Sequence, residues 1–437
     1  MRGLKIAVIG GGSSYTPELV DGFIRRAAEL PVCEICLVDI AAGERKLKIV
    51  SELARRMVAA AGLNISITAT LNRQEALRGA DFVVTQFRVG GLTARARDER
   101  FPLPYHVLGQ ETTGPGGFAK ALRTIPVMLD ICADMAAWCP DAWLINFTNP
   151  AGLITESVLK YTQTKCIGLC NVPIHMQMTI AKLLEAKPRE LFIDFVGLNH
   201  LLWGRKVCLK GGDVTGEVLA KLQDGAALSV KNIPDLKWDG EFLRALGMVP
   251  CPYHRYYYMT DALLAEELAA AAPDGPGTRA EQVQAVENRL FELYADPALR
   301  EKPAELEKRG GAYYSDAAVS LISALYNDKR EIHTVDTLNN GAISELPADC
   351  VVETNCLIGK NGPVPLAAGD LPPAITGLLR QVKAYEQLAV EAGVRGDRAK
   401  ALLALVTHPL VPSVEIAKQL LADILRLNAA YLPQFKD

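Results

Sequence analysis

Apolar runs alternate with amphipathic segments through the first 200 residues of the chain. Short apolar runs bounded by turn residues are typical of buried strands, and they occur at residues 4–9, 34–40, 65–69, 82–87, 143–147, 166–169 and 191–196. Apolar residues at helical spacing lie between several of them, over 45–61, 118–137, 153–161 and 175–185. Because strands that alternate with helices form parallel sheets, this pattern predicts an α/β fold with a doubly wound, Rossmann-like sheet.

The pattern changes beyond about residue 200, where helical periodicity dominates. Helices are predicted over 280–295, 316–326, 375–392 and 414–430, while residues 359–373, rich in glycine and proline, are predicted to be irregular. We therefore expect two domains that share one cleft. The first is a nucleotide-binding domain over 1–195, and the second is a helix-rich C-terminal domain over 196–437.

Composition and charge narrow the classes of function. The chain has 437 residues, of which 49% are hydrophobic and 22% charged, a composition that suits globular domains and excludes disorder. Its formal net charge of -3 gives no basic surplus for nucleic acid or an anionic membrane. No apolar run approaches the roughly 18 residues of a membrane span and no secretory signal is visible, so we expect a soluble, cytoplasmic protein. The 10 cysteines are scattered, and we expect buried thiols rather than disulfides.

A glycine-rich turn follows the first predicted strand and opens a helix. Gly10 and Gly12 fill the first two positions of the G-x-G-x-x-G fingerprint, while Tyr15 stands at the third. Asp39 ends the next strand, where a carboxylate accepts the ribose hydroxyls and repels a 2′-phosphate. The turn therefore predicts NAD rather than NADP, the alternative being a glycine turn that binds nothing. The residues expected to bind the cofactor are Gly10, Gly12, Ser13, Ser14 and Asp39.

A thiol and an imidazole follow two later strands. Cys170 comes directly after the strand at 166–169, and His200 follows the strand near 191–196. Because ligands bind beyond the carboxyl ends of strands in open α/β sheets, these two side chains can converge. One thiolate and one imidazole leave positions open on a divalent metal for substrate oxygens, and Mn²⁺ accepts oxygen ligands as well. A buried core thiol and a structural histidine are the alternatives.

Three further segments carry residues that could take part in catalysis or in binding. Tyr253 lies in a tyrosine-rich segment, and a tyrosine acts as a base only where nearby cations, such as a metal ion, lower its pKa from about 10. Residues 109–117 form a polar, glycine-rich loop that could line a cofactor or substrate. An anion could be held by the basic set Arg88, Arg95, Arg97 and Arg100. The alternatives are a packed aromatic segment, a surface loop and a solvated helix face.

Ordered motifs run through nearly the whole chain. They comprise residues 8–18, 86–92, 109–114, 146–150, 168–173 and 197–200, then Tyr253, Arg279 and His408 with Pro409. Together they resemble glycoside hydrolase family 4, the NAD- and metal-dependent glycosidases, and most strongly its members that act on 6-phospho-β-glucosides. So many motifs in order are far more specific than any one of them. The resemblance implies an architecture like that of lactate and malate dehydrogenases, and a homodimer or homotetramer.

The resemblance also implies a reaction unlike that of glycosidases that use two carboxylates. In this family NAD oxidises the sugar at carbon 3, the proton at carbon 2 is removed, and the glycosidic oxygen is eliminated. Water then adds and the hydride returns, while a divalent metal, here most simply Mn²⁺, polarises the carbonyl as a Lewis acid. The implied activity is hydrolysis of phosphorylated β-glucosides, such as phosphorylated cellobiose or aryl β-glucosides.

Position by position, the resemblance assigns roles to residues of this chain. Cys170 and His200 match the metal ligands, Tyr253 matches the base at carbon 2, and Glu111 matches the residue that makes this tyrosine more basic. Asn171 stands where α-glycosidases of the family have an acidic aspartate, which argues against α-glucosidase activity and leaves the acid for the leaving group unidentified. The substrate-binding positions are Arg95, Asn149, Asn171 and Arg279.

Other functions could use the same nucleotide-binding domain. A dehydrogenase of a hydroxy acid or a sugar would produce NADH with its substrate, whereas the glycosidase produces none. A silent NAD- or sugar-responsive protein would bind NAD without turnover, and the joint presence of Cys170, His200 and Tyr253 argues against it. A member of the same family that acts on another sugar, or on a glycoside without phosphate, is the nearer alternative.

Overall fold

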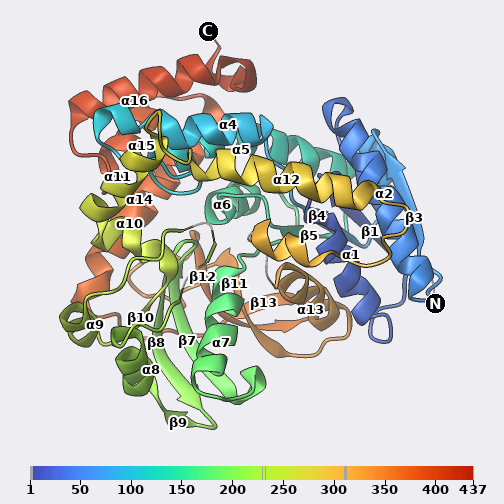
Figure 1. Ribbon diagram of the computed structural model, residues 1–437, viewed down its shortest axis with the longest axis horizontal. Helices are drawn as coiled ribbons and strands as arrows, with labels where there is room; N and C mark the ends of the chain where they lie inside the picture. Colours follow the sequence, from blue (N-terminus) through green and yellow to red (C-terminus); the bar gives the residue numbers. More distant parts are fainter. Residues whose placement is uncertain (1–2, 229, 232, 310–312, 437) are drawn as a thin grey trace.

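Six parallel strands form one part of a continuous 13-stranded sheet in the computed structural model, which describes residues 3–228, 230–231, 233–309 and 313–436 (Figure 1). They are β1 (Leu4–Ile9), β2 (Val32–Val38), β3 (Ser66–Thr70), β4 (Phe82–Thr85), β5 (Trp143–Asn146) and β6 (Cys166–Gly168). Their order is β3-β2-β1-β4-β5-β6, which is that of dinucleotide-binding sheets. The parallel, doubly wound sheet predicted from the sequence is therefore confirmed.

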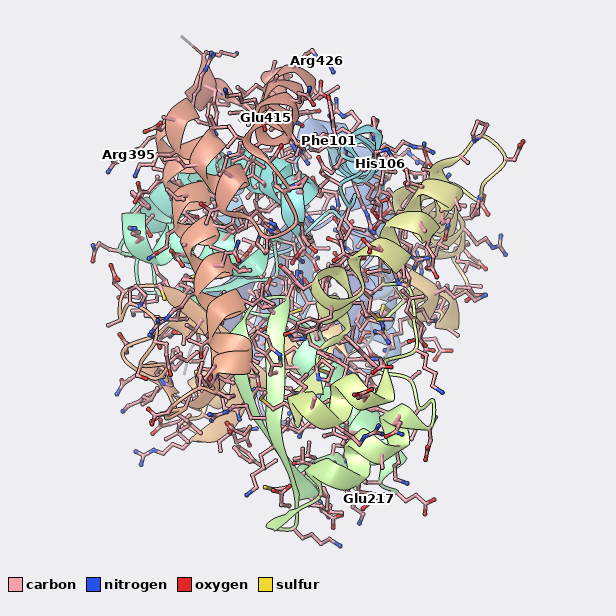
Figure 2. All side chains as sticks on the ribbon, turned by 90° about the vertical axis from the view of Figure 1, so that its left-hand side faces the viewer. Phe101, His106, Glu217, Arg395, Glu415 and Arg426 are labelled. Carbon is pink, nitrogen blue, oxygen red and sulfur yellow. The ribbon has the colours of Figure 1, made fainter. Side chains whose placement is uncertain are left out.

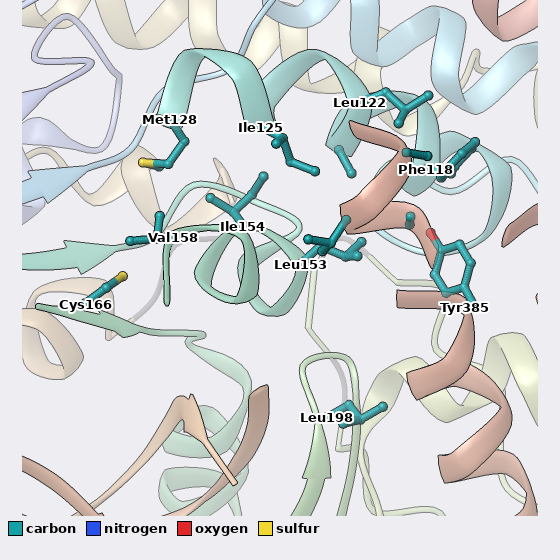
Figure 3. Packing of buried hydrophobic residues seen from close by; sticks show 14 of the residues in the cluster. Phe118, Leu122, Ile125, Met128, Leu153, Ile154, Val158, Cys166, Leu198 and Tyr385 are labelled. Carbon is teal, nitrogen blue, oxygen red and sulfur yellow. The ribbon is translucent and has the colours of Figure 1, made fainter. Parts of the chain in front are cut away.

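Helices cover both faces of this parallel part. They are α1 (Thr16–Arg25), α2 (Glu44–Ala60), α3 (Arg73–Leu77), α4 (Gly91–Arg100), α5 (Gly114–Trp138), α6 (Ala151–Tyr161) and α7 (Val172–Leu183). The side chains of β1 alternate between two cores: Ile6 and Val8 share one with α1 and α2, whereas Ala7 and Ile9 share the other with α5 and α6. Figure 3 shows side chains of α5 and α6 packed together in the second core. This alternation explains why the strands read as continuous apolar runs.

The C-terminal half adds antiparallel strands to the same sheet. They are β7 (Leu191–Leu198), β8 (Leu201–Leu209), β9 (Gly212–Asp213), β10 (Val249–Pro250), β11 (Glu331–Leu338), β12 (Val351–Gly359) and β13 (Gly362–Pro365). The sheet continues from β6 into β11 at the pair Gly168 and Asp336, and from β12 into β7 at the pair Glu353 and Gly197. The prediction missed β11 and β12, because buried polar side chains such as Asp336 and Glu353 conceal their apolar pattern. It was also wrong to treat all of 359–373 as irregular, since β13 lies there.

The remaining helices pack around this extended sheet. They are α8 (Thr215–Gln223), α9 (Gly240–Leu246), α10 (Arg255–Tyr258), α11 (Thr260–Ala271), α12 (Arg279–Ala295), α13 (Tyr314–Tyr326), α14 (Pro373–Arg395), α15 (Arg398–Thr407) and α16 (Val414–Leu427). The four C-terminal helices predicted from periodicity are thus present as α12, α13, α14 and α16. The division at residue 195 stays a prediction, and the sheet runs across it.

Helix α12 connects the two halves of the chain, and charged side chains of both signs lie at the surface. The helix α12 reaches back over the nucleotide-binding half, where it packs on α2 and α4 (Figure 1). The surface carries charges of both signs, among them Glu217, Arg395, Glu415 and Arg426 at the periphery of the molecule (Figure 2). No helix of the described residues is long and apolar enough to cross a membrane.

Candidate active site

The glycine turn between β1 and α1 has no room for side chains. Gly10 has a φ of +82°, and a Cβ there would lie 3.0 Å from the carbonyl group of Gln86. A Cβ on Gly12 would lie 2.8 Å from Asp39 Oδ2. That same oxygen accepts a hydrogen bond of 2.9 Å from the Gly12 N–H, so Asp39 lies directly beside the turn. A bare backbone next to a carboxylate at the end of β2 fits the pyrophosphate and ribose of a dinucleotide.

Tyr15, at the place of the third fingerprint glycine, packs against the C-terminal half. Its ring stacks on that of Tyr314 with centroids 5.6 Å apart, and the Arg309 guanidinium lies 4.9 Å from its centroid. The substitution is tolerated because this ring finds its contacts away from β1. Ser13 and Ser14 lie between the glycines and this ring, with Ser14 buried and Ser13 partly exposed.

Glu111, in the loop before α5, is the centre of a buried group of charges. Its Oε1 pairs with Arg95 Nη1 at 3.0 Å, and its Oε2 pairs with Lys120 Nζ at 2.8 Å and also with Arg88. Burial alone would raise the pKa of Glu111, but the charges of Arg88, Arg95 and Lys120 hold it well below its usual range. Glu111 is therefore a permanent anion surrounded by positive charge.

Tyr253 packs face to face on His200. The two ring centroids are 3.7 Å apart and the ring planes differ by 9°. Thr112, the neighbour of Glu111 in the chain, donates its hydroxyl to the Tyr253 hydroxyl at 3.4 Å. Burial raises the pKa of Tyr253, and the nearby Cys170 raises it further. The phenol is thus neutral in this environment, and a cation bound beside it would favour the phenolate.

His200 has the surroundings of a metal-binding histidine. It lies in the turn between β7 and β8 with a φ of +64°, and the Thr112 backbone hydrogen-bonds its ring. Its Nδ1 is buried and has no hydrogen-bond partner in the part of the chain that the structure describes. An imidazole held through one nitrogen, with the other left for a ligand, is the usual arrangement at a metal.

Cys170 supplies a sulfur donor near the same tyrosine. It follows β6, and its Sγ accepts a hydrogen bond of 3.5 Å from the Val172 N–H. Burial raises the pKa of the thiol, and the charge of Glu353 raises it further, an effect that a bound cation would reverse. Across the described ranges, no group of three or more Cys, His, Asp or Glu side chains could hold a metal. Cys170 and His200 fit a metal that takes its other ligands from a substrate.

The expected substrate-binding residues come from different elements of the fold. Asn149 follows β5, and its Oδ1 is buried without a hydrogen-bond partner among the described residues. Asn171 directly precedes α7. Arg279 begins α12, where burial and the charges of Arg95 and Arg309 lower its pKa. The Arg279 guanidinium therefore lies close enough to those of Arg95 and Arg309 to be repelled by both.

Glu99 of α4 ties Arg95 to the start of α12. Its Oε1 accepts a hydrogen bond of 2.7 Å from Arg95 Nε, and its Oε2 accepts one of 2.7 Å from the Ala280 N–H. A carboxylate at this point is favoured by the dipole of α12. Because Arg279 immediately precedes Ala280, this link holds Arg279 and Arg95 in one site although 184 residues separate them in sequence, from 279 minus 95.

Sequence reasoning treated the basic set as one group, and the structure divides it. Arg88 and Arg95 meet Glu111, whereas Arg97 bonds the Leu427 carbonyl group at 2.9 Å and Arg100 pairs with Glu281 at 2.8 Å. It also missed three residues of the site, Glu99, Thr112 and Lys120. Lys120 had no local signal, because it lies on an otherwise apolar stretch of α5. Thr112 stood within the polar loop that was singled out as a whole.

Known proteins of similar sequence extend this description. The family model described as family 4 glycosyl hydrolase matches residues 5–186, and the model of the family 4 glycosyl hydrolase C-terminal domain matches residues 195–411. The chain is 56% identical over 436 residues to a protein of Bacillus subtilis (strain 168) called probable 6-phospho-beta-glucosidase, which covers 99% of this chain and 98% of the relative.

Solved structures agree over the whole length. The 6-phospho-beta glucosidase of Thermotoga maritima with NAD and glucose-6-phosphate has a TM-score of 0.90 at 39% identity, over 98% of this chain and 99% of that one. The same enzyme with manganese, NAD+ and glucose-6-phosphate has a TM-score of 0.89, at the same identity of 39% and the same coverage of 98% and 99%. Malate dehydrogenase from Plasmodium falciparum, 13% identical over 90% of this chain and 98% of its own, has a TM-score of 0.57, which confirms the dehydrogenase-like fold. With both family models matched and a site of this composition, the chain belongs to family 4 of the glycosyl hydrolases.

Proposed function

We propose that this glycosidase hydrolyses 6-phospho-β-glucosides, such as phosphorylated cellobiose or aryl β-glucosides, with NAD and Mn²⁺ bound. The observation that carries the proposal is the packing of Tyr253 on His200 beside the Glu111 group. A base in contact with a metal ligand suits removal of a proton next to a polarised carbonyl, rather than hydrolysis by paired carboxylates. The relatives with NAD, manganese and glucose-6-phosphate support the same cofactors and substrate class.

We assign the two cofactors to separate groups of residues in this chain. The dinucleotide is assigned to Gly10, Gly12, Ser13, Ser14 and Asp39, and the metal to Cys170 and His200. When bound, NAD accepts and returns a hydride at carbon 3 and Mn²⁺ acts as a Lewis acid, so that hydrolysis proceeds by oxidation, elimination, addition of water and reduction.

Tyr253 accepts the carbon-2 proton at its hydroxyl oxygen. Thr112 orients that oxygen through the 3.4 Å hydrogen bond. Glu111 takes no proton itself, because its cations keep it ionised. Burial and Cys170 raise the pKa of Tyr253, and the charge of Glu111 adds to this rise, which makes the phenolate a stronger base. This electrostatic effect explains how Glu111 could make Tyr253 more basic, the role that the family resemblance assigns to it.

Arg279 is the residue that we assign to the phosphate of the substrate. It lies near Arg95 and Arg309, and their charges add to burial in lowering its pKa. A phosphate dianion relieves such repulsion, and guanidinium groups bind phosphate oxygens in pairs. We assign Asn149 and Asn171 to the sugar. Asn171 carries an amide, which cannot serve as the acid, in keeping with a β-linked substrate.

We also infer that the enzyme works in the cytoplasm and assembles as a homodimer or homotetramer. All ten cysteines, each within the described part of the chain, are free thiols, which suits a reducing compartment. Light scattering in solution measures the assembly, and a monomer at enzyme-assay concentrations would contradict it.

The test of the function is release of nitrophenol from p-nitrophenyl β-glucoside 6-phosphate with NAD and Mn²⁺. The matched compounds are the unphosphorylated β-glucoside and the phosphorylated α-anomer. We expect release from the phosphorylated β-glucoside alone, lost when either cofactor is withheld. Net NADH formation without nitrophenol would contradict the proposal and favour a dehydrogenase. Release from either matched compound at the same rate would contradict the phosphate or the anomer assignment.

A further inference from the structure

Lys120 is a buried lysine that the proposed reaction leaves without a role. It lies near the start of α5 and is 2% exposed, and its Nζ contacts Glu111 Oε2 at 2.8 Å. The same carboxylate already pairs with Arg88 through Oε2 and with Arg95 through Oε1. One carboxylate therefore faces three cations in a region from which water is largely excluded.

The charges of the side chains that pair directly around Glu111 balance without the proton of Lys120. Arg88 and Arg95 offset Glu111 and Glu99, since Glu99 pairs with Arg95 at 2.7 Å. A protonated Lys120 adds one positive charge beyond that balance. Guanidinium groups do not lose their protons in proteins, and Glu111 is held ionised. By elimination, Lys120 is the member of the group that can exchange a proton.

The surroundings of Lys120 determine how readily it does so. Charged or titratable groups face it from four other segments, namely Arg88 after β4, Arg95 and Asp98 on α4, Glu111 before α5 and His200 between β7 and β8. Burial and then the charge of Arg88 lower the pKa of Lys120 to about 7, against the attraction of Glu111. Its charge therefore changes near neutral pH.

We propose that Lys120 sets the charge of the active site by gaining or losing its proton, and that its ammonium form holds the Glu111 carboxylate ionised and in place beside Tyr253 while the carbon-2 proton is removed. In that step the C–H bond at carbon 2 breaks, the proton passes to the tyrosine oxygen, and the electron pair stays on the sugar. Lys120 is a positioning residue, because it acts through Glu111 and forms no bond to the substrate. In a site from which water is largely excluded, the ammonium group holds the carboxylate more strongly than it would in water. This inference rests on the proposed function.

The experiment compares pH profiles of kcat for the wild type, Lys120→Arg and Lys120→Met with p-nitrophenyl β-glucoside 6-phosphate. Lys302→Arg is the control for the same exchange elsewhere, because Lys302 pairs with Glu18 on α1, outside the site. Arginine keeps its charge at every pH tested. We expect the alkaline limb of the wild-type profile to move up by at least about one pH unit in Lys120→Arg. Lys120→Met should lose that limb, with kcat at pH 6 at least about tenfold lower, and Lys302→Arg should match the wild type.

An alkaline limb at the same pH in Lys120→Arg and the wild type would overturn the inference. If the methionine variant does not fold, the arginine variant alone decides. A second readout needs no turnover: the pH dependence of urea unfolding between pH 6 and 9. A lysine whose pKa is lowered by folding makes the protein more stable as pH rises through this window, because the unfolded chain binds the extra proton. Lys120→Arg should lack this rise. An identical rise in stability in Lys120→Arg would refute the inference, whether or not the wild type hydrolyses a glycoside. Absence of hydrolysis by the wild type would count against the proposed function alone.

Discussion

Replacing Glu111 by Gln would remove the negative charge at the centre of the active site with little change in the shape of the side chain. The side chain of Glu111 is 8% exposed, and its partners Arg95 and Lys120 are 2% and 3% exposed. Removing one member of a buried ion pair costs about 3–5 kcal/mol, because it leaves a charge without compensation. Arg95 keeps Glu99 as a partner and the Arg88 side chain is 22% exposed to water, so the cost falls mainly on Lys120.

The magnitude should depend on pH. Lys120, whose pKa is already lowered to about 7, escapes part of the cost by releasing its proton. In the wild type the pair of Lys120 with Glu111 contributes at pH 6 and is largely lost at pH 9, where the lysine is neutral. We therefore expect Glu111→Gln to destabilise the protein by about 3 kcal/mol at pH 6 and by less at pH 9.

Urea unfolding followed by circular dichroism, at pH 6 and pH 9, measures this effect. The wild type, Glu111→Gln, Lys120→Met and the double variant form a complete cycle. At pH 6 the double variant should lose less than the sum of the single losses, by about 2 kcal/mol, because neither charge is then left alone. A Glu111→Gln variant within about 0.5 kcal/mol of the wild type at both pH values, with additive effects in the cycle, would refute the reasoning.

Three further changes probe separate parts of the molecule. His200→Ala should abolish tight Mn²⁺ binding, measured by the electron paramagnetic resonance of the free ion, and should leave NAD binding unchanged; loss of both would indicate a collapsed site. Tyr253→Phe should slow exchange of the carbon-2 proton with deuterated water by about 10²-fold or more, with substrate affinity retained, and unchanged exchange would remove Tyr253 from its role. Burial raises the pKa of Asp336 to about 8, so the folded chain favours its protonated form and stability falls as pH rises from about 4 towards 8. Asp336→Asn removes this loss, and its advantage in urea unfolding should grow between pH 5 and pH 8 towards about 4 kcal/mol; an advantage independent of pH would show that the carboxyl does not titrate as described.

Most of the nucleotide-binding half follows from local physical chemistry. Six short apolar runs with turn residues between them are typical of strands, and their alternation with amphipathic helices predicts a parallel sheet. The turn at Gly10 was recognisable because only glycine suits its positive φ and its close contact with Gln86. The rule that places ligands beyond the ends of parallel strands applies to Cys170 after β6, whereas His200 follows β7, which pairs antiparallel with its neighbours.

The strands of the C-terminal half were harder to predict from the sequence, because they do not have a simple apolar pattern. β11 and β12 bury polar side chains such as Asp336 and Glu353, and β11 joins the parallel sheet only through the contact of Asp336 with Gly168. This pairing joins residues 168 and 336, which are 168 positions apart in the sequence, so no local periodicity can predict it. The extension of the sheet is therefore a property of the folded chain alone.

The same distinction holds within the active site. The sequence by itself singled out the residues that we expect to carry chemistry, because Tyr253, Cys170, His200 and Glu111 stand at matching positions in the ordered motifs of the family. Tertiary structure alone decided the electrostatics around them. Lys120 becomes the third cation on one carboxylate, and Glu99 joins Arg95 to the start of α12, through contacts that the fold creates. A pKa depends on burial and on charges within a few ångströms, and those distances exist only once the helices have packed.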